Sequence, residues 1–329
     1  MRDESIGWCI EEFMGYCQSK DLRPKTMASY EQTLRLFERW LREEQEIFDV
    51  SGITEATMRK YILSLQERGK YSFYADDSQK KTNCPDRRRD YRKKVSATTI
   101  NNYIRNLKVF VNWLDGIYFF KRNPVKNVKQ IRTSRKPKEF ISDDDYNKLV
   151  GLLDKSYFSE HRDYAMINLM LDTGMRLGEC SRLLVDDLDL ARKSIKLREE
   201  ETKGRKDRVV FFSEKTEKIV RRWIQFKDRY VETAYLFPVK KTGAHVEVAT
   251  FETNFKSYIK RAGLKDNISP HCLRNNFAKR CLMNGMDIYT LSRILGHSSV
   301  EVTENAYLDL TDEDLGKKFE KYSPLATLQ

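Results

Sequence analysis

The sequence predicts a mainly α-helical protein of two domains, in which an all-α bundle is followed by an α+β domain with a small β-sheet. A length of 329 residues is typical of two domains. Apolar residues recur at helical spacing in the first half, and two short strand-like segments lie in the second half. Because 40% of the residues are hydrophobic, each half can form a packed core.

Four amphipathic helices are predicted in the first half, and they indicate a small bundle over residues 1–120. Thr54 is a typical capping residue for the third helix, which we expect to end at Gly69. Ser96 starts the fourth helix, which we expect to end at Gly116. The apolar positions that define the four helices are Ile6, Ile10, Phe13 and Cys17; Tyr30, Leu34, Phe37 and Leu41 within 25–45; Met58, Ile62 and Leu65; and Ile100, Ile104, Val109 and Trp113.

Residues 71–95 interrupt this helical pattern with a polar and aromatic insertion that carries basic runs at 87–89 and 92–94. One interpretation is a solvated surface loop. The other is a DNA-contacting loop, because flexible Lys and Arg side chains near tyrosines suit phosphates and exposed bases. The sequence leaves both interpretations open.

A basic linker, residues 121–141, is predicted between the domains. Residues 121–138 lack periodicity, contain two prolines and are almost free of acidic residues. Ser142 and the three aspartates after it form a helix start signal, which opens a second domain at 142–329.

The second domain is predicted to mix helices with two strands. The segments SIKLREEE and DRVVFF are the strands, joined by a turn at 203–206. Thr311 and the acidic residues after it start a C-terminal helix at 311–323. The other helices are expected at 143–154, 160–173, 176–184, 214–230, 250–262, 271–283, 287–295 and 299–307.

The charge of the chain suggests a polyanionic partner. The formal net charge is +12 and the isoelectric point is about 9.2. Residues 1–140 contribute +10 of that charge and residues 141–329 only +2. Nucleic acid is the commonest polyanion that such a protein meets, although a basic protein without an anionic partner is the alternative. The first half therefore suits a grip on phosphates, and the second half a more specialised role.

Cysteine usage and hydropathy favour a cytosolic protein. The six cysteines form no C-x-x-C pair, which indicates reduced thiols. The N-terminal segment lacks the pattern of a signal peptide, and no apolar run approaches the length of a membrane span. We also find no metal-ligand cluster, and we expect no metal and no cofactor.

Several short motifs of the second half carry residues with catalytic potential, although each has a plainer explanation. Arg176 and Glu179 stand three apart after Gly174, as surface ion pairs often do. His271 and Arg274 are also three apart; His can move a proton near neutral pH, and Arg can bind two phosphate oxygens. The plainer explanation is a structural histidine beside a surface arginine.

Three further residues complete the set. His297 follows a Leu-Gly pair, and Tyr307 comes ten residues later. A phenol with a pKa near 10 is a poor nucleophile unless it is activated. Lys203 lies in the predicted turn, where Gly204 permits a tight conformation that presents the ammonium inward. A turn lysine is usually just solvated.

Together and in this order, these residues resemble the tyrosine recombinases, which include Xer proteins, Cre and the integrases of phages and mobile elements. The motifs that carry the resemblance are TGMRLGE, KGRKDR, HCLRNNFA and ILGHSSVEVTENAY, within residues 172–307. The helical first half resembles the SAM-like core-binding domain of that family, and the second half its catalytic domain. The helical bundle starts within the first six residues, so the small arm-binding domain of many phage integrases is not expected.

The resemblance implies a site-specific recombinase that works without metal or ATP through a 3′-phosphotyrosine. Tyr307 would be the nucleophile, His271 its general base and Lys203 the general acid. Arg176 and Arg274 would clamp the phosphate oxygens, His297 would hydrogen-bond one of them, and Glu179 would hold the site in shape.

The resemblance also implies double-stranded DNA as the partner, bound by a homotetramer on two duplexes at a site with inverted repeats, with accessory DNA-bending proteins in some systems. The cellular place would be the bacterial cytoplasm, at the nucleoid. The basic insertion favours a mobile-element enzyme over one that resolves DNA multimers. The residues expected to contact DNA are Lys25, Arg87, Arg88, Arg89, Arg92, Lys93, Lys94, Arg105, Lys108, Arg135, Lys136, Lys256, Lys260 and Arg261.

Two rival functions remain open from the sequence. A type IB topoisomerase uses a related site to relax supercoils, and a DNA-binding protein without catalysis is the other alternative. The tail helix has two possible docking sites. It packs either on its own domain or, as the resemblance implies, on the neighbouring protomer.

Overall fold

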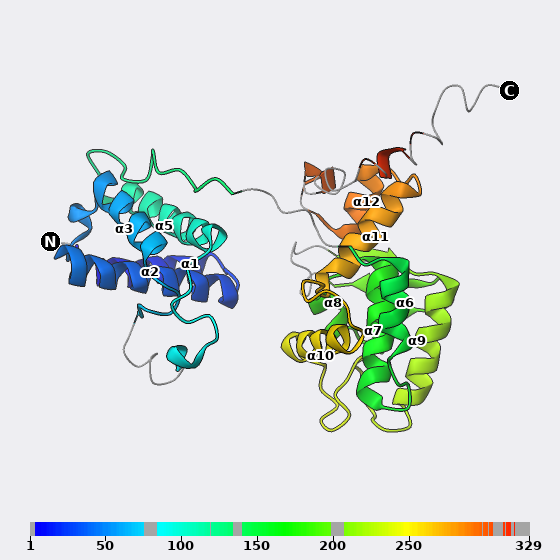
Figure 1. The fold of residues 1–329 in the computed structure, drawn as a ribbon. Helices are drawn as coiled ribbons and strands as arrows, with labels where there is room; N and C mark the ends of the chain where they lie inside the picture. Colours follow the sequence, from blue (N-terminus) through cyan, green and yellow to red (C-terminus); the bar gives the residue numbers. More distant parts are fainter. Residues whose placement is uncertain are drawn as a thin grey trace. The chain divides into compact units, whose positions relative to one another are not determined.

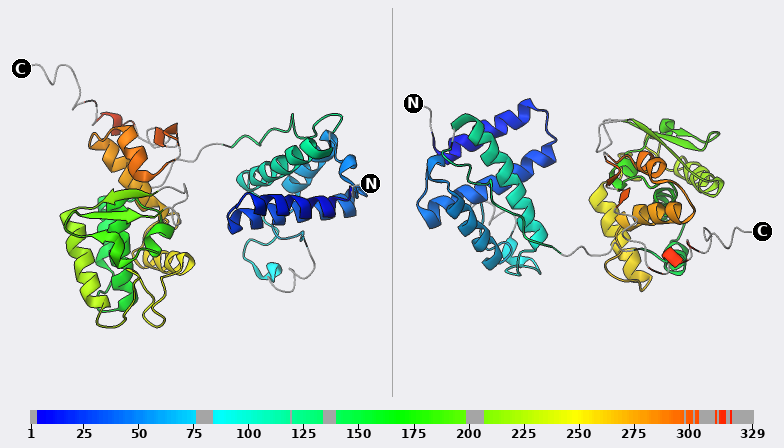
Figure 2. Two further views of the ribbon diagram at one scale, coloured as in Figure 1. Left: turned by 180° about the vertical axis from the view of Figure 1, so that it is seen from behind. Right: turned by 90° about the horizontal axis from the view of Figure 1, so that it is seen from above.

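The computed structural model describes residues 4–75, 84–118, 120–133, 140–198, 207–297, 299–301, 303–304, 312, 314–316 and 319. The chain divides into two compact units, Met1–Arg135 and Lys136–Gln329. Figures 1 and 2 show the two units from three directions.

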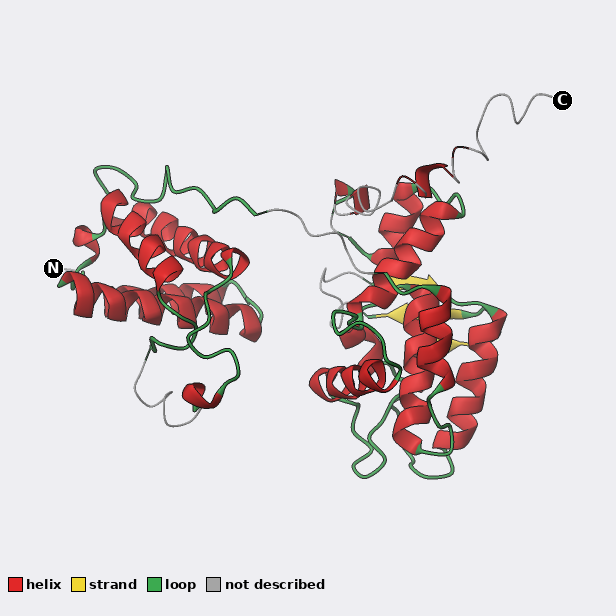
Figure 3. Cartoon of the chain, viewed as in Figure 1, coloured by secondary structure: helices red, strands yellow, loops and turns green. Residues whose placement is uncertain are grey.

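The described residues of the first unit form a bundle of four α-helices, which are drawn in red in Figure 3. Thr54 caps the third of them through a hydrogen bond from the Thr57 backbone, as its sequence pattern predicts. The last helix runs through Gly116, which was expected to end it. A glycine costs a helix only about 1 kcal/mol, and the buried Leu114 holds this last turn in the core. The helices are α1 Ile6–Ser19, α2 Pro24–Gln45, α3 Glu55–Glu67 and α5 Ala97–Tyr118, with short 3₁₀ turns η1 Val50–Gly52 and η2 Pro85–Arg87.

The core of the first unit is strongly aromatic. Phe37, Trp40 and Tyr61 are buried and lie with ring centroids between 4.8 and 6.3 Å of one another. These contacts join α2 to α3 in the middle of the bundle.

Part of the predicted linker packs on this bundle, and the stretch between the domains is therefore shorter than expected. Val125 and Val128 are buried in the core of the first unit. The Asn101 amide pairs with the backbone of Ile131, whose N–H donates to Oδ1 and whose carbonyl accepts from Nδ2. Two valines three residues apart were too weak a signal to predict a packed segment among the prolines and charged residues around them.

The second unit is built around helix α7, whose buried residues occur on several sides. It packs against α9 and α11, and Figure 1 shows α6, α7 and α9 side by side. The helices are α6 Asp143–Gly151, α7 Phe158–Thr173, α8 Leu177–Ser181, α9 Glu214–Lys227, α10 Val248–Arg261, α11 His271–Met283 and α12 Ile288–Leu295, with the 3₁₀ turn η3 Val185–Asp187.

A small antiparallel sheet in the order β1-β2-β3 completes the second unit (Figure 3, yellow). Its strands are β1 Leu188–Asp189, β2 Ser194–Leu197 and β3 Arg208–Phe211. Ile195 pairs with Val210, and both point into the core. β1 was missed because two residues show no alternation. The predicted turn at 203–206 lies outside the described residues.

Candidate active site

The site begins at the start of α8, where Glu179 holds Arg176 in two ways. The Arg176 backbone N–H donates to Glu179 Oε2 at 2.8 Å, and the guanidinium Nη1 donates to Oε1 at 2.8 Å. Glu179 is buried, whereas the Arg176 side chain is 27% exposed. The pair therefore fixes one face of Arg176 and leaves part of its guanidinium accessible.

A second arginine, Arg208 on β3, binds the same carboxylate. Its Nη1 and Nη2 donate to Glu179 Oε1 and Oε2 at 3.0 and 2.6 Å, which is the bidentate geometry that makes arginine–carboxylate pairs strong. Burial by itself would raise the pKa of Glu179, but the hydrogen bonds and charges of Arg208 and Arg176 lower it. Glu179 is therefore a carboxylate at neutral pH.

Arg274, on α11, is the third arginine of the site, and only 4% of its surface is exposed. Its Nη1 donates to the Gly174 carbonyl at 2.7 Å and its Nη2 to the Leu295 carbonyl at 2.8 Å. Burial, then the positive charge of Arg176, lowers the pKa of Arg274 to about 9, a shift that Glu179 opposes and Arg208 increases. The guanidinium therefore stays charged at neutral pH without a carboxylate of its own.

The three arginines converge on the C-terminal end of α12, where consecutive backbone carbonyls each accept from a different arginine. The Ile294 carbonyl binds Arg208 Nε at 3.1 Å, Leu295 binds Arg274 and Gly296 binds Arg176 Nη2 at 3.4 Å. The last carbonyls of a helix lack partners within the helix and lie at the negative end of its dipole. The end of α12 is thus a natural place to gather cations.

Two glycines allow this convergence. Gly174 ends α7 with φ +66°, and a Cβ there would lie 2.3 Å from the Phe277 ring. Gly296 ends α12 with φ +65°, and a Cβ there would lie 2.8 Å from the Arg208 side chain. A side chain at either position would be strained, and at Gly296 it would also displace the Arg208 side chain.

His297 comes directly after Gly296 in the chain, and contacts at both of its ring nitrogens fix its orientation. Its Nε2 lies 2.9 Å from Arg274 Nη2 and its Nδ1 lies 2.8 Å from the hydroxyl of the buried Thr303. Because arginine only donates, Nε2 accepts and Nδ1 carries the proton in this arrangement. The ring is thereby fixed beside the Arg274 guanidinium.

Of the seven predicted site residues, the structure brings Arg176, Glu179, Arg274 and His297 together. His271, the first residue of α11, is exposed. Lys203 and Tyr307 lie outside the described residues. Arg208 and Thr303 were not predicted as site residues, although Arg208 ends the motif KGRKDR. For Arg208 a signal existed, since it shares a strand face with the inward-pointing Val210.

The charges of the described site are unbalanced. Arg176 and Arg208 share one carboxylate, that of Glu179, and Arg274 binds backbone carbonyls only, so three positive charges meet one negative charge in the described part of the site. Clustered cations in a partly buried place are costly unless an anion joins them. Arginine forks match phosphate oxygens in particular. The geometry is therefore suited to a phosphate.

Most predicted DNA-contacting residues can be located. Those that the structure describes are exposed or half-buried: Lys25, Arg87, Arg88, Arg89, Arg92, Lys93, Lys94, Arg105, Lys108, Lys256, Lys260 and Arg261. Arg261 also holds α10 to α7, since its Nη1 donates to Glu160 at 2.6 Å. Arg135 and Lys136 lie outside the described residues.

The described residues offer neither a metal-binding cluster nor a membrane-spanning helix. They contain no group of three or more His, Cys, Asp or Glu side chains placed to hold a metal ion. Among the same residues, no helix combines the length and the apolar character needed to cross a membrane.

Sequence comparison relates the chain to known recombinases. Residues 139–314 match the model of the phage integrase family. A tyrosine recombinase of Thermosipho africanus is 30% identical over 66% of this chain and 73% of its own length. The tyrosine recombinase XerC of Listeria innocua is 26% identical over 97% of this chain and 99% of its own.

Structural comparison points to the same fold. The Tn1549 transposon integrase, solved in complex with a circular intermediate DNA, aligns with a TM-score of 0.72 and 18% identity, covering 98% of this chain and all of the other. A lambda integrase dimer bound to a core site aligns with a TM-score of 0.67 and 12% identity over 94% and 97% of the two chains. The mainly helical fold with a small sheet is confirmed.

Proposed function

The chain belongs to the phage integrase family and is a site-specific tyrosine recombinase, and we propose that it cleaves and rejoins double-stranded DNA with Tyr307 as nucleophile. The observation that carries the proposal is the gathering of Arg176, Arg208 and Arg274 at the C-terminal end of α12, with Glu179 as the one carboxylate that pairs with Arg176 and Arg208 in the described part of the site. A scissile phosphate would supply the missing negative charge. Family membership favours recombination over the topoisomerase and over a catalytically silent binder.

The proposed reaction exchanges one phosphodiester for another. The Tyr307 oxygen attacks the phosphorus, its proton goes to His271, and the bond from phosphorus to the 5′-oxygen breaks. Lys203 protonates the leaving 5′-oxygen, which becomes a hydroxyl, and a 3′-phosphotyrosine remains. Rejoining is the reverse with a 5′-hydroxyl of the partner duplex, so the bond energy is conserved and ATP is not required.

The arginines act on the charge of the transition state. As the phosphorus gains a fifth oxygen, negative charge grows on its non-bridging oxygens. Arg274 is held by the carbonyls of Gly174 and Leu295, and Arg176 by Glu179, so neither must reorganise when that charge develops. His297, oriented by Thr303, would donate from a protonated Nε2 to a phosphate oxygen beside Arg274. These fixed charges make a metal unnecessary in this scheme.

For the biological role, we propose integration and excision of a mobile element by a homotetramer on two DNA duplexes. The basic insertion at 71–95 favours this role over resolution of DNA multimers. Accessory DNA-bending proteins and a place at the bacterial nucleoid belong to the same proposal. Mapping where the protein binds in its own genome tests it, since the ends of a mobile element should be enriched. Enrichment at one chromosomal site far from any mobile element would favour multimer resolution.

Trapping the covalent intermediate tests the chemistry. The substrate is a duplex that carries the mapped site and a nick beside the cleavage position. Cleavage releases the short fragment that bears the new 5′-hydroxyl, so rejoining is prevented and the 3′-phosphotyrosine accumulates. We expect a covalent complex with the natural protein and none with Tyr307→Phe, whose DNA affinity should remain, since one phenol hydroxyl adds little to a largely electrostatic grip. A covalent complex with Tyr307→Phe would show that another residue is the nucleophile.

A further inference from the structure

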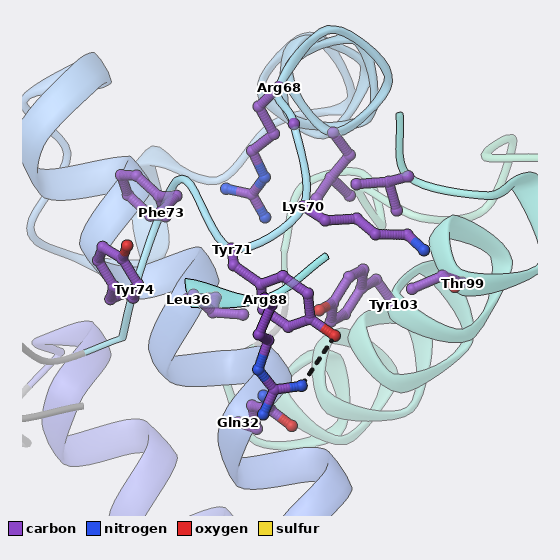
Figure 4. Close-up of a pocket in the computed structure, with 13 residues that line it drawn as sticks. Gln32, Leu36, Arg68, Lys70, Tyr71, Phe73, Tyr74, Arg88, Thr99 and Tyr103 are labelled. Carbon is purple, nitrogen blue, oxygen red and sulfur yellow. Dashed lines mark hydrogen bonds between the residues drawn. The ribbon is translucent and has the colours of Figure 1, made fainter. Parts of the chain in front are cut away.

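A pocket in the first unit lies between the basic insertion and helices α2, α3 and α5, apart from the candidate active site in the second unit. Its volume is about 390 Å³, which lies within the usual range of roughly 300–1,000 Å³ for small-ligand sites. Figure 4 shows its lining, which combines aromatic rings with the side chains of Arg68, Lys70 and Arg88.

The insertion is anchored beside this pocket by backbone hydrogen bonds. Lys70 N–H donates to the Lys93 carbonyl at 2.8 Å, and Arg92 N–H donates to the Lys70 carbonyl at 2.9 Å. Gly69 lies so close to the backbone of Arg92 that a Cβ there would approach it to 2.5 Å. The two ends of the insertion are thus joined, and the pocket wall is part of the folded unit.

Arg68 is the unusual residue of the pocket. Its Nη1 is buried and has no hydrogen-bond partner in the part of the chain that the structure describes. Its guanidinium lies over the rings of Phe73 and Tyr61, at 5.0 and 5.5 Å from their centroids. Ring faces attract a cation but do not accept the directed hydrogen bonds that a buried guanidinium needs. A buried, unpaired N–H donor is therefore a place for an anionic acceptor.

The charges around Arg68 also favour an anionic ligand. Lys70 pairs with Asp90 at 3.2 Å, while Arg88 donates from Nη1 to the Tyr71 hydroxyl at 3.2 Å and stacks over that ring at 4.6 Å. No carboxylate is among the residues that line the pocket in the described chain. Three cations with one neighbouring carboxylate leave a surplus of positive charge that suits a phosphate.

The aromatic lining distinguishes a nucleotide from a simple phosphate. Tyr71 comes from the insertion and Tyr103 from α5, and Figure 4 shows both rings within the pocket. Tyr71 has a φ of +59°, a strained conformation for a residue with a side chain, and such strain is concentrated at functional positions. Aromatic rings beside arginines are the features with which proteins hold unstacked bases.

We propose that this pocket binds a single unstacked nucleotide, with its phosphate at Arg68 and Arg88 and its base against Tyr71 and Tyr103. The source is either a nucleotide that has left the stack of a DNA duplex or a free mononucleotide. The first source rests on the DNA binding in the proposed function, and the experiment distinguishes the DNA nucleotide from the free mononucleotide.

The test uses the full-length protein and two short duplexes of equal sequence, one intact and one with a single unpaired 2-aminopurine nucleotide. We expect roughly tenfold tighter binding to the bulged duplex, together with a change in 2-aminopurine fluorescence as the base stacks on tyrosine. Arg68→Met and Arg88→Ala should each remove this preference, measured as the ratio of the two affinities. Arg68→Met should also leave binding to the intact duplex within about twofold. Arg59→Ala is the matched control, since it removes an exposed charge from α3 outside the pocket and should keep the preference.

Melting curves of each variant report whether it is folded. Arg88 is exposed, so Arg88→Ala keeps the test valid if Arg68→Met unfolds. In a second arm, millimolar 2′-deoxyadenosine 5′-monophosphate is added without DNA. Stabilisation of the natural protein but not of Arg88→Ala, without a preference for bulged DNA, identifies a free nucleotide as the source.

The proposal is overturned if the natural protein shows neither a preference for the bulge nor stabilisation by the mononucleotide, or if both pocket variants keep the preference. If the natural protein binds neither the intact nor the bulged duplex, that result instead contradicts the proposed function. The two failures are therefore distinguishable.

Discussion

Arg208 binds both carboxylate oxygens of Glu179, at 3.0 and 2.6 Å, and through them sets the position of Arg176. Both partners are nearly inaccessible, with side-chain exposures of 9% and 2%. Glu179 thus links a strand residue to the arginine at the start of α8. Arg208 is a positioning residue in this arrangement, since its guanidinium is occupied by Glu179 and the Ile294 carbonyl.

Removing Arg208 should destabilise the second unit. In Arg208→Ala the buried Glu179 keeps only Arg176 as a cationic partner, and breaking a buried ion pair typically costs about 3–5 kcal/mol. Arg208→Lys should recover only part of this, because an ammonium cannot bind both oxygens in a fork. Urea unfolding measures the change. Arg192→Ala, which removes an exposed arginine near the same sheet, should change stability by less than about 0.5 kcal/mol. An Arg208→Ala protein as stable as this control would show that the pair is not needed for the fold.

Glu179 should make stability depend on pH in a defined direction. Its pKa in the folded protein lies below the usual value of about 4.3. Its stabilising contribution is therefore complete above the unfolded pKa and is lost as the pH falls through the folded one. The difference in unfolding free energy between the natural protein and Glu179→Gln should be largest near neutral pH and shrink below about pH 4. Denaturant titrations from neutral to acid pH measure it, and a constant difference would contradict the prediction.

Lys203 should be needed only while the leaving group requires a proton. Lys203→Ala is expected to cleave normal DNA slowly, by a factor on the order of 10²–10⁴. Cleavage should recover on DNA whose 5′-bridging oxygen is replaced by sulfur, because a thiolate leaves without protonation. Single-turnover rates on the two substrates give the comparison, with Lys215→Ala as a lysine control in the same unit. Equal defects on oxygen and sulfur would assign the proton to another group.

The C-terminal tail should serve assembly more than DNA binding. Asp314 pairs with Lys279 of α11 at 2.5 Å, whereas Leu315 and Phe319 are 50% and 66% exposed. A short helix needs a surface for its apolar residues, and a neighbouring protomer would provide one. Deleting 311–329 should leave single-site binding nearly intact and impair the two-duplex complex and recombination.

Lys279→Ala is the informative companion to this deletion, because it removes the ion pair between Asp314 and the chain's own domain and leaves the apolar residues in place. Mobility-shift assays with one and with two duplexes separate binding from assembly. A truncated protein that assembles and recombines at the natural rate would show that the tail acts only within its own protomer.

The sequence predicted most helices well because their signals are local. α11 has the bounds predicted for it, His271–Met283, and Ser142 caps α6 by accepting from the Asp145 backbone. The errors lie where tertiary packing outweighs local preference. α5 continues through Gly116 to Tyr118, and Val125 and Val128 draw the start of the expected linker into the core of the first unit.

For the candidate site, the sequence by itself determined which residues carry chemistry and that they occur in the order typical of the family, because motifs are local and survive without coordinates. Only the tertiary structure decided how the arginines are held. The carbonyls of Ile294, Leu295 and Gly296 receive arginines that lie 86, 21 and 120 residues away in sequence. Which carbonyl each guanidinium reaches depends on how β3, α8 and α11 pack around the end of α12. No periodicity or spacing encodes that packing, so Arg208 became part of the site only in three dimensions.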